Sequence, residues 1–342
     1  MKQPAWIIVG TWQWAKRQIP WIAMGGLLVF HLPWAQSQVV NSRQNPLQIA
    51  TLHWYPVNQT ALFTVQFQPV TVAFDGANIW VANNLHTVTK LRANDGAILG
   101  NFTVGECTWG LAFDGANIWV TDNCQNIVTK LRASDGTSLG TFGTGREPRD
   151  VAFDGANIWI ANFNDNTVTK LSASNGSPLG TFTVGTSPNG VIFDGANIWV
   201  ANESSNTVTK LRATDGKVLG TFAAGGSPFR LAFDGANIWV TNQLTAGSVT
   251  KLRASNGANL GTFAAGVFPW GVAFDGANIW VANNGDVTVN KYRASDGTNL
   301  GTFTSGLTST SNPSGVAFDG ANIWVANEFD GTANGFDTLS KF

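Results

Sequence analysis

Short runs of apolar residues alternate with polar, turn-forming clusters along most of this chain. In the copy of the pattern that spans 190–225, residues 191–193 are apolar, 198–202 are apolar except for Asn202, and mixed segments follow at 207–213 and 217–223. Clusters of Asp, Asn, Gly and Ser separate the segments, and these residues favour tight turns. No window shows a sustained helical period. The pattern therefore predicts four short strands joined by short loops, which form an antiparallel meander.

This pattern returns about every 40 residues. The motif Phe-Asp-Gly-Ala-Asn-Ile-Trp occurs seven times, and successive copies begin 39, 40, 40, 40, 41 and 44 residues apart. A period near 40 residues built from short strands is typical of a β-propeller, in which each repeat forms one blade. The copies begin at Phe74, Phe113, Phe153, Phe193, Phe233, Phe274 and Phe318. We therefore expect residues 61–342 to form one all-β domain, a seven-bladed β-propeller of four-stranded antiparallel blades.

The two ends of the array predict how the ring closes. The last copy ends with a third strand at 337–342 and has no fourth strand after it. Ahead of the first copy, 63–69 aligns without gaps on 182–188, which holds a fourth strand and its following loop. Pairing these two ends would remove the open edges that a linear stack exposes. The expectation is a split last blade that the N-terminal strand completes.

The residues before the array have a different composition. Basic residues at 2, 16 and 17 precede an apolar stretch at 19–34, and the small residues Ala35 and Ser37 follow it. This order is typical of a secretory signal, and the stretch is short for a membrane span. We expect a signal peptide at 1–37, a lead-in segment at 38–60, and a secreted, periplasmic or cell-surface protein. An uncleaved N-terminal anchor is the alternative.

Residues present in every copy are first explained by the fold. The motif Trp is expected to fill the space between neighbouring blades, because one sheet is too thin to bury its own faces. A lysine also recurs on each third strand, and we expect its stem to lie on apolar surface with its charge in water. A ring of lysines that binds an anion is the alternative. These lysines are Lys90, Lys130, Lys170, Lys210, Lys251, Lys291 and Lys341.

Positions that differ between copies are the candidate functional residues. Two loops of each repeat vary most, and in a propeller both emerge on one face, the first of them at the central channel. Aromatic, charged and amide side chains at this rim suit a ligand held by stacking and hydrogen bonds. The candidate binding residues are Trp109, Arg149, Asp150, Asn189, Phe229, Arg230 and Trp270. Drift on solvent-facing loops, with the aromatic residues partly packing the channel mouth, is the alternative.

The two cysteines of the chain lie in these same loops. Cys107 precedes the first strand of the second copy, and Cys124 lies between its second and third strands. Because both loops should open on one face of one blade, we expect a disulfide, which an oxidising compartment would preserve. A pair of free, reactive thiols is the alternative.

Catalytic, metal and cofactor sites are not predicted. A Ser/His/Asp triad needs a histidine as base, and the array contains only His86. Glu147 and Asp150 have the chemistry for acid–base catalysis, but they neighbour Arg146 and Arg149, so salt-bridged loop charges are the alternative. The acidic loops lack the Asp-x-Asp-x-Asp-Gly spacing of a calcium site.

Repeats of the form Pro-x-Gly-Val-Ala-Phe-Asp-Gly-Ala-Asn-Ile-Trp-Val-Ala-Asn, followed by Asn-Thr-Val-Thr-Lys-Leu, resemble those of the YVTN-type bacterial β-propellers, typified by the YncE-like proteins. The resemblance covers 61–342 and implies an extracytoplasmic binding or surface protein. The chain is more distantly similar to the virginiamycin B lyase group, also a seven-bladed ring. That resemblance implies a metal-assisted lyase with histidines and a glutamate near one channel mouth, whereas the later blades here contain no histidine.

The sequence therefore favours an exported, monomeric binding scaffold over an enzyme. Only 12% of the 342 residues are charged, and the formal net charge is −1. No field of one sign attracts nucleic acid or an anionic membrane, so neither is an expected partner. An unknown protein, peptide or carbohydrate is expected instead, with no membrane insertion once the signal is cleaved. A lyase or hydrolase with its site on the same face is the alternative function, and a purely mechanical surface protein is a third.

Overall fold

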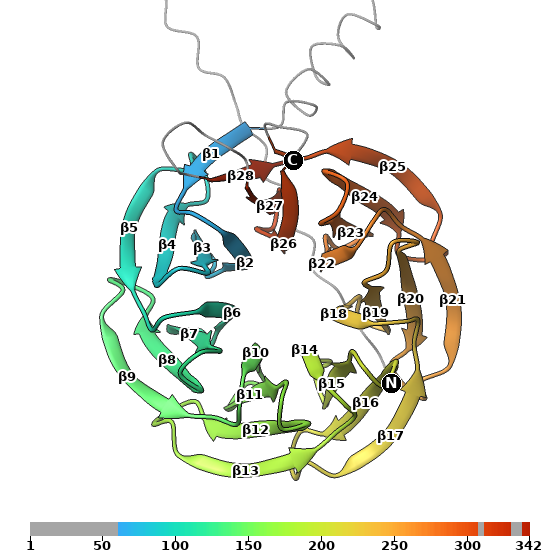
Figure 1. Ribbon diagram of the computed structural model, residues 1–342, viewed down its shortest axis with the longest axis horizontal. Coiled ribbons are helices and arrows are strands. Elements are labelled where there is room, and N and C mark those ends of the chain that lie inside the picture. Colours follow the sequence, from blue (N-terminus) through green and yellow to red (C-terminus); the bar gives the residue numbers. More distant parts are fainter. Residues whose placement is uncertain (1–60, 307–310, 330–336) are drawn as a thin grey trace, which may run out of the picture. The chain divides into compact units, whose positions relative to one another are not determined.

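Seven four-stranded sheets surround one axis in the computed structural model, which describes residues 61–306, 311–329 and 337–342 (Figure 1). The chain divides into two units, Met1–Thr51 and Leu52–Phe342. The expected signal peptide at 1–37 and the lead-in segment at 38–60 lie outside the described residues. Within the described part of the chain, no helix is long and apolar enough to cross a bilayer.

The blades follow one another along the chain, and each is an antiparallel sheet that runs outwards from the axis (Figure 1). Blade 1 contains β2 (Pro69–Phe74), β3 (Asn78–Asn83), β4 (Thr87–Arg92) and β5 (Ile98–Thr103). Blade 2 contains β6 (Thr108–Phe113), β7 (Asn117–Asp122), β8 (Ile127–Arg132) and β9 (Ser138–Gly143). Blade 3 contains β10 (Pro148–Phe153), β11 (Asn157–Asn162), β12 (Thr167–Ser172) and β13 (Pro178–Thr183). Blades 4 and 5 contain β14 (Pro188–Phe193), β15 (Asn197–Asn202), β16 (Thr207–Arg212) and β17 (Val218–Ala223); and β18 (Pro228–Phe233), β19 (Asn237–Asn242), β20 (Ser248–Arg253) and β21 (Asn259–Ala264). Blade 6 contains β22 (Pro269–Phe274), β23 (Asn278–Asn283), β24 (Thr288–Arg293) and β25 (Asn299–Thr304), and blade 7 contains β26 (Asn312–Phe318), β27 (Ile323–Glu328), β28 (Asp337–Lys341) and β1 (Ala61–Val65).

Blade 7 closes the ring as the sequence predicts. Strand β1 pairs antiparallel with β28, with Phe63 opposite Leu339, and completes the order β1-β28-β27-β26. A Cβ on Gly96 of blade 1 would lie 2.1 Å from the ring of Phe63. Gly136 of blade 2 stands in the same relation to Phe102 of blade 1. The split blade therefore packs on its neighbour as a continuous blade does.

The motif Trp fills the space between blades, as expected. Trp80 of blade 1 is fully buried and packs with Ile118 and Leu131 of blade 2. Phe102 of the fourth strand stacks on Trp80, with ring centroids 5.6 Å apart. Equivalent Trp–Phe pairs recur in the other blades. The core is therefore seven similar apolar layers between sheets, and each layer needs its neighbour.

The motif Asp fixes the first turn and also holds the Trp. Asp154 accepts hydrogen bonds from the amides of Ala156 at 2.9 Å and Asn157 at 2.6 Å, and from the Trp159 indole Nε1 at 2.7 Å. Gly155 between them adopts a φ of +97°, which favours glycine. Burial alone would raise the pKa of Asp154, but these donors stabilise the carboxylate and leave its pKa lowered.

The expectation that the recurrent lysines hold their charges in water is wrong. Lys170 is only 7% exposed, and its Nζ donates to the carbonyl oxygens of Ala213 at 2.7 Å and Thr214 at 3.2 Å in the next blade. The same Nζ lies 4.9 Å from the ring centroid of Trp159. Five further lysines donate to the next blade in this way. Each of these six ammonium groups therefore bridges two blades and binds carbonyl oxygens rather than an anion.

Candidate functional site

The candidate binding residues lie on the innermost strands of the ring. Strands β6, β10, β14, β18 and β22 face the axis from five consecutive blades (Figure 1). Each carries one variable residue directly after its first position, and blades 3 and 5 carry a second. We call this set the axial cluster: Trp109, Arg149, Asp150, Asn189, Phe229, Arg230 and Trp270.

Aromatic side chains of the axial cluster meet across the ring. Trp109 belongs to blade 2 and Trp270 to blade 6, which are not neighbours, yet their ring centroids are 6.0 Å apart. Phe229 of blade 5 packs edge-on against Trp270 at 4.6 Å. Phe229 is buried, whereas the two Trp residues remain partly exposed. These side chains thus pack on one another and still present surface.

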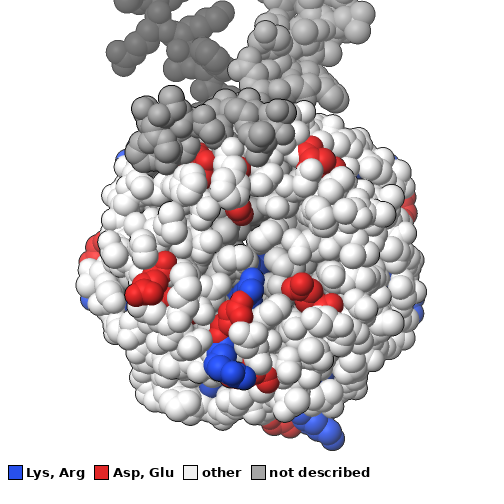
Figure 2. Space-filling model, in the orientation of Figure 1, with Lys and Arg blue, Asp and Glu red and all other residues white. Residues whose placement is uncertain are grey.

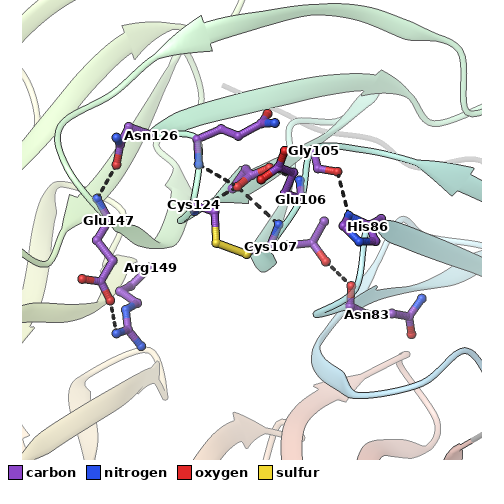
Figure 3. Close-up of a disulfide and its surroundings, with 12 residues drawn as sticks. Asn83, His86, Gly105, Glu106, Cys107, Cys124, Asn126, Glu147 and Arg149 are labelled. Carbon is purple, nitrogen blue, oxygen red and sulfur yellow. Dashed lines mark hydrogen bonds and ion pairs between the residues drawn. A yellow bond between two sulfur atoms is a disulfide. The ribbon is translucent and has the colours of Figure 1, made fainter.

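Arg149 extends the aromatic contact into blade 3. Its guanidinium carbon lies 4.7 Å from the ring centroid of Trp109 and 4.5 Å from that of Phe163. Its Nη2 also forms an ion pair with Glu147 (Figure 3). A guanidinium between two aromatic rings is held by cation–π attraction as well as by its charge partner. The side chain is therefore fixed before any ligand arrives.

A buried ion pair joins two blades that are not neighbours. Arg230 Nη1 of blade 5 lies 3.0 Å from Asp150 Oδ2 of blade 3, and both side chains are less than 15% exposed. Asp150 also accepts the amide of Val191 at 3.0 Å, and Arg230 donates to the Asn189 carbonyl at 3.3 Å, both in blade 4. Burial raises the pKa of Asp150, and the charge of Arg230 offsets part of that rise.

Other blades carry glycine at the positions of Asp150 and Arg230, and these glycines let neighbouring inner strands pack closely. A Cβ on Gly190 would lie 2.4 Å from the carbonyl oxygen of Phe229, so glycine lets neighbouring inner strands approach closely. Gly110 and Gly271 have the same relation to the following blade. Where Asp150 and Arg230 replace glycine, the chain instead carries a side-chain ion pair across blade 4.

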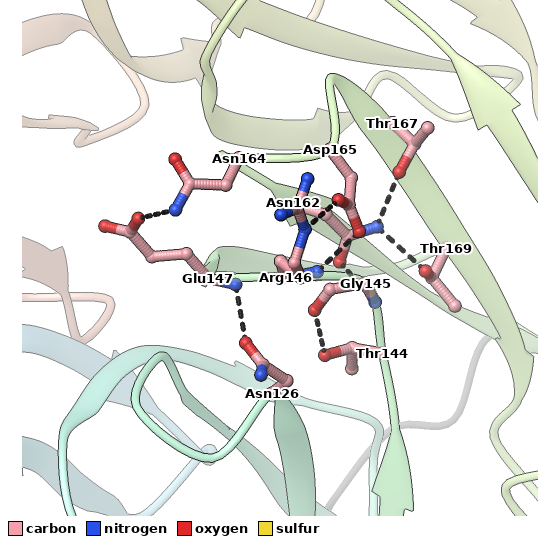
Figure 4. A network of polar contacts seen from close by, with 10 residues as sticks. All are labelled: Asn126, Thr144, Gly145, Arg146, Glu147, Asn162, Asn164, Asp165, Thr167 and Thr169. Carbon is pink, nitrogen blue, oxygen red and sulfur yellow. Dashed lines mark hydrogen bonds and ion pairs between the residues drawn. The ribbon is translucent and has the colours of Figure 1, made fainter.

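Charge on this face is sparse, and its basic groups are concentrated near one blade, whereas acidic groups also lie over other blades (Figure 2). Figure 2 shows a short strip of alternating basic and acidic groups that runs from near the centre over blade 3, with mostly uncharged surface around it. In the loops of blade 3, Arg146 Nε pairs with Asp165 at 2.5 Å, and Asn164 donates to Glu147 at 2.5 Å (Figure 4). A cavity of about 420 Å³ lies beside these groups and extends to Cys124.

The disulfide between Cys107 and Cys124 is confirmed, with the two Cα atoms 5.5 Å apart (Figure 3). Buried Asp122 beneath it accepts the amides of Cys124 and Gln125, each at 3.0 Å, as well as that of Glu106. Both sulfurs are bonded to each other, so they are not free to ligate a metal with Asp122. The bridge and the aspartate together fix the loops of blade 2 next to the axial cluster.

Sequence reasoning missed several residues that complete the site. Phe163 contacts Arg149, Asn164 donates to Glu147, the ion partner of Arg149, and Asp122 organises the disulfide loops. Asp122 carried a signal, because an Asn stands at its position in the other six copies. The contacts of Phe163 with Arg149 had no such signal.

The carboxylates considered for acid–base chemistry are both paired with arginines. Glu147 is bound to Arg149, and Asp150 to Arg230, which agrees with salt-bridged charges. Among the described residues, His86 is the only histidine, and its Nδ1 lies 3.4 Å from the Gly105 carbonyl oxygen in an exposed loop (Figure 3).

Comparison with known proteins places the fold more firmly than the family. No family model and no curated protein sequence matches the chain. Solved structures with a similar fold include "Kuenenia stuttgartiensis Hydrazine Synthase" (16% identity, TM-score 0.67, covering 82% of this chain and 97% of that chain) and "Streptogramin B lyase structure" (16% identity, TM-score 0.67, 83% and 96%). "Structure of U3-55K" is also similar (13% identity, TM-score 0.71, 82% and 97%). The chain is a seven-bladed propeller. At these identities the likeness concerns the fold alone.

Proposed function

We propose that this protein is an exported β-propeller that acts as a binding scaffold, with the axial cluster as its contact surface. One observation supports this proposal above the others. Five consecutive blades place four different kinds of side chain at one equivalent position, with Trp in two of the blades, although the scaffold motifs of the same blades are identical. These side chains reach one another across the axis, as Trp109 and Trp270 do at 6.0 Å. A ring made only for mechanical closure needs no such differentiation.

Export and family membership belong to the same proposal. The disulfide between Cys107 and Cys124 persists best in an oxidising compartment, and the apolar segment at 19–34 has the order of a secretory signal. The repeats over 61–342 support a place among the YVTN-type propellers. The partner in this proposal is a protein, a peptide or a carbohydrate.

A lyase or hydrolase at the same face stays a prediction from the sequence. Its proposed residues Arg149, Asp150 and Arg230 are held in ion pairs. A general base needs a free lone pair within reach of the proton it takes. No observation on the axial cluster therefore favours this second function.

The proposal is tested by screening glycan and peptide arrays with the wild-type protein and two double variants. Trp109→Ala with Trp270→Ala removes the central aromatic contact. Leu244→Ala with Phe268→Ala is the control, because both side chains are about 40% exposed and lie outside the axial cluster. We expect ligands that bind the wild type and the control equally well to bind the first variant at least tenfold more weakly. Unchanged affinity for that variant would contradict the proposal.

A further inference from the structure

The axial cluster contains an unusual number of buried polar atoms without hydrogen-bond partners. Eight side-chain nitrogen or oxygen atoms of this kind occur among the described residues, and five of them belong to the axial cluster. Buried polar groups in native proteins nearly always have a partner, so five at one place require an explanation. They are Trp109 Nε1, Arg149 Nε, Asn189 Oδ1, Arg230 Nη2 and Trp270 Nε1. Each comes from a different blade, in the unbroken order from blade 2 to blade 6.

The chemistry of these five atoms is one-sided. Four are N–H donors, two from indoles and two from guanidinium groups, and only Asn189 Oδ1 is an acceptor. Donors do not satisfy one another. The complement of this set is therefore a molecule with several acceptor oxygens and at least one hydroxyl or amine donor. Guanidinium N–H groups bind carboxylates more strongly than they bind neutral acceptors.

The donors are held in place by contacts that leave the unpartnered atoms unused. Arg230 is 8% exposed, and its Nη1 contacts Asp150 while Nη2 has no partner. Arg149 lies between two aromatic rings and bonds Glu147 through Nη2, which leaves Nε without a partner. Asn189 is fully buried, and its Nδ2 donates to Glu203 at 2.8 Å. The five atoms themselves are almost fully buried, so a ligand reaches them only if the indoles of Trp109 and Trp270 move apart, whereas the guanidinium groups are already ordered by folding.

Charge selects among the acceptor-rich ligands. The two guanidinium groups are balanced by Glu147 and Asp150, so the formal charge of these four side chains is zero. Burial lowers the pKa of Arg230, and the nearby charge of Arg149 lowers it further. One additional negative charge between the guanidinium groups relieves their repulsion, and Glu147 and Asp150 repel it about half as strongly as they would repel a dianion such as phosphate.

We infer that the axial cluster binds a small hydroxylated carboxylate, of which the sugar acids are the simplest class. Its carboxylate and ring oxygens accept hydrogen bonds from the guanidinium and indole groups, and one hydroxyl donates to Asn189 Oδ1. This inference rests on the proposed function, because it assigns a ligand class to the same contact surface.

Calorimetric titration of the full chain with D-galacturonate and D-glucuronate tests the inference, with galactose, glucose and inorganic phosphate as comparison ligands. Trp109→Phe and Trp270→Phe each keep an aromatic ring and remove one N–H donor. Each is expected to weaken sugar-acid binding about 3- to 10-fold, the effect of one hydrogen bond. Trp239→Phe is the matched control, because its indole donates to Asp234 in the scaffold and not to the axis.

The outcomes separate the inference from the function on which it rests. Saturable sugar-acid binding that both axial variants weaken, and the control does not, supports the inference. Equal binding of neutral sugars or of phosphate overturns the carboxylate assignment. No heat at ~10 mM sugar acid overturns the inference as well. In both of these cases the proposed scaffold function is contradicted only if the ligands found on the glycan and peptide arrays bind the Trp109→Ala, Trp270→Ala double variant with unchanged affinity.

Discussion

Replacing a single interblade lysine should measure how strongly the blades hold one another. In Lys170→Met the side chain keeps its length and most of its volume, so no large cavity forms. The variant loses the Nζ hydrogen bonds to the carbonyl oxygens of Ala213 at 2.7 Å and Thr214 at 3.2 Å, and the cation–π contact with Trp159. The two carbonyls are left with one partner fewer in a buried place.

The magnitude follows from opposing contributions. A hydrogen bond to a charged group contributes about 1.5–3 kcal/mol, and a cation–π contact about 0.5–2 kcal/mol. Removing a buried ammonium also removes its desolvation cost, which offsets part of that sum. We expect Lys170→Met to lower the free energy of unfolding by about 2 kcal/mol.

Lys291 provides the matched control within the same chain. It occupies the same strand position in blade 6, and its Nζ lies 4.6 Å from the ring centroid of Trp280. Among the described residues its Nζ has no hydrogen bond to the next blade. Lys291→Met should therefore cost well under half as much as Lys170→Met.

Urea unfolding followed by tryptophan fluorescence measures both variants. The midpoint should fall clearly for Lys170→Met and little for Lys291→Met, with unchanged dependence on urea concentration. Equal losses in the two variants, or a stabilised Lys170→Met, would show that the carbonyl bonds do not hold the blades together. The buried ammonium would then be a cost that the fold tolerates.

Three further predictions concern single features of the fold. Replacing Cys107 and Cys124 by Ser should cost about 3 kcal/mol, the chain-entropy value for a loop of this length, and reductant should shift the urea midpoint of the wild type but not of the variant. Burial raises the pKa of Glu328 to about 8, and Asp337 adds to the rise, so stability should fall as pH rises from about 4.5 through 8. Glu328→Gln should flatten that decline. If the urea midpoint of this variant still falls between pH 5 and pH 8.5 as much as that of the wild type, another group causes the decline. Asp154→Ala leaves the Trp159 indole N–H without its acceptor and should cost about 1–3 kcal/mol. Because the pKa of Asp154 is lowered in the folded state, this contribution is present above the ordinary Asp pKa and is lost as pH falls from that value through the lowered pKa. The free energy of unfolding of Asp154→Ala should therefore depend less on pH in acid than that of the wild type.

Repetition is what let the sequence specify the ring. Each motif copy supplies its own turn aspartate, its own Trp and its own strands, and none of these depends on distant residues. Seven copies and a missing fourth strand predicted both the blade number and the closure of Phe63 against Leu339, which the structure confirms. The disulfide followed in the same way, because Cys107 and Cys124 lie in two loops of one blade.

Only the tertiary structure decided what the side chains between blades do. The recurrence of the lysines predicted that their stems lie on apolar surface, but the carbonyls that bind Lys170 belong to the next blade. Likewise, the variation between copies identified the axial residues. It did not show that Trp109 contacts Trp270 or that Asp150 pairs with Arg230 across an intervening blade. A local pattern determines strands and turns, because those depend on residues a few positions apart. Contacts across the axis depend on the tilt of each sheet and on the distance between the inner strands. Both are set only when all seven blades pack together.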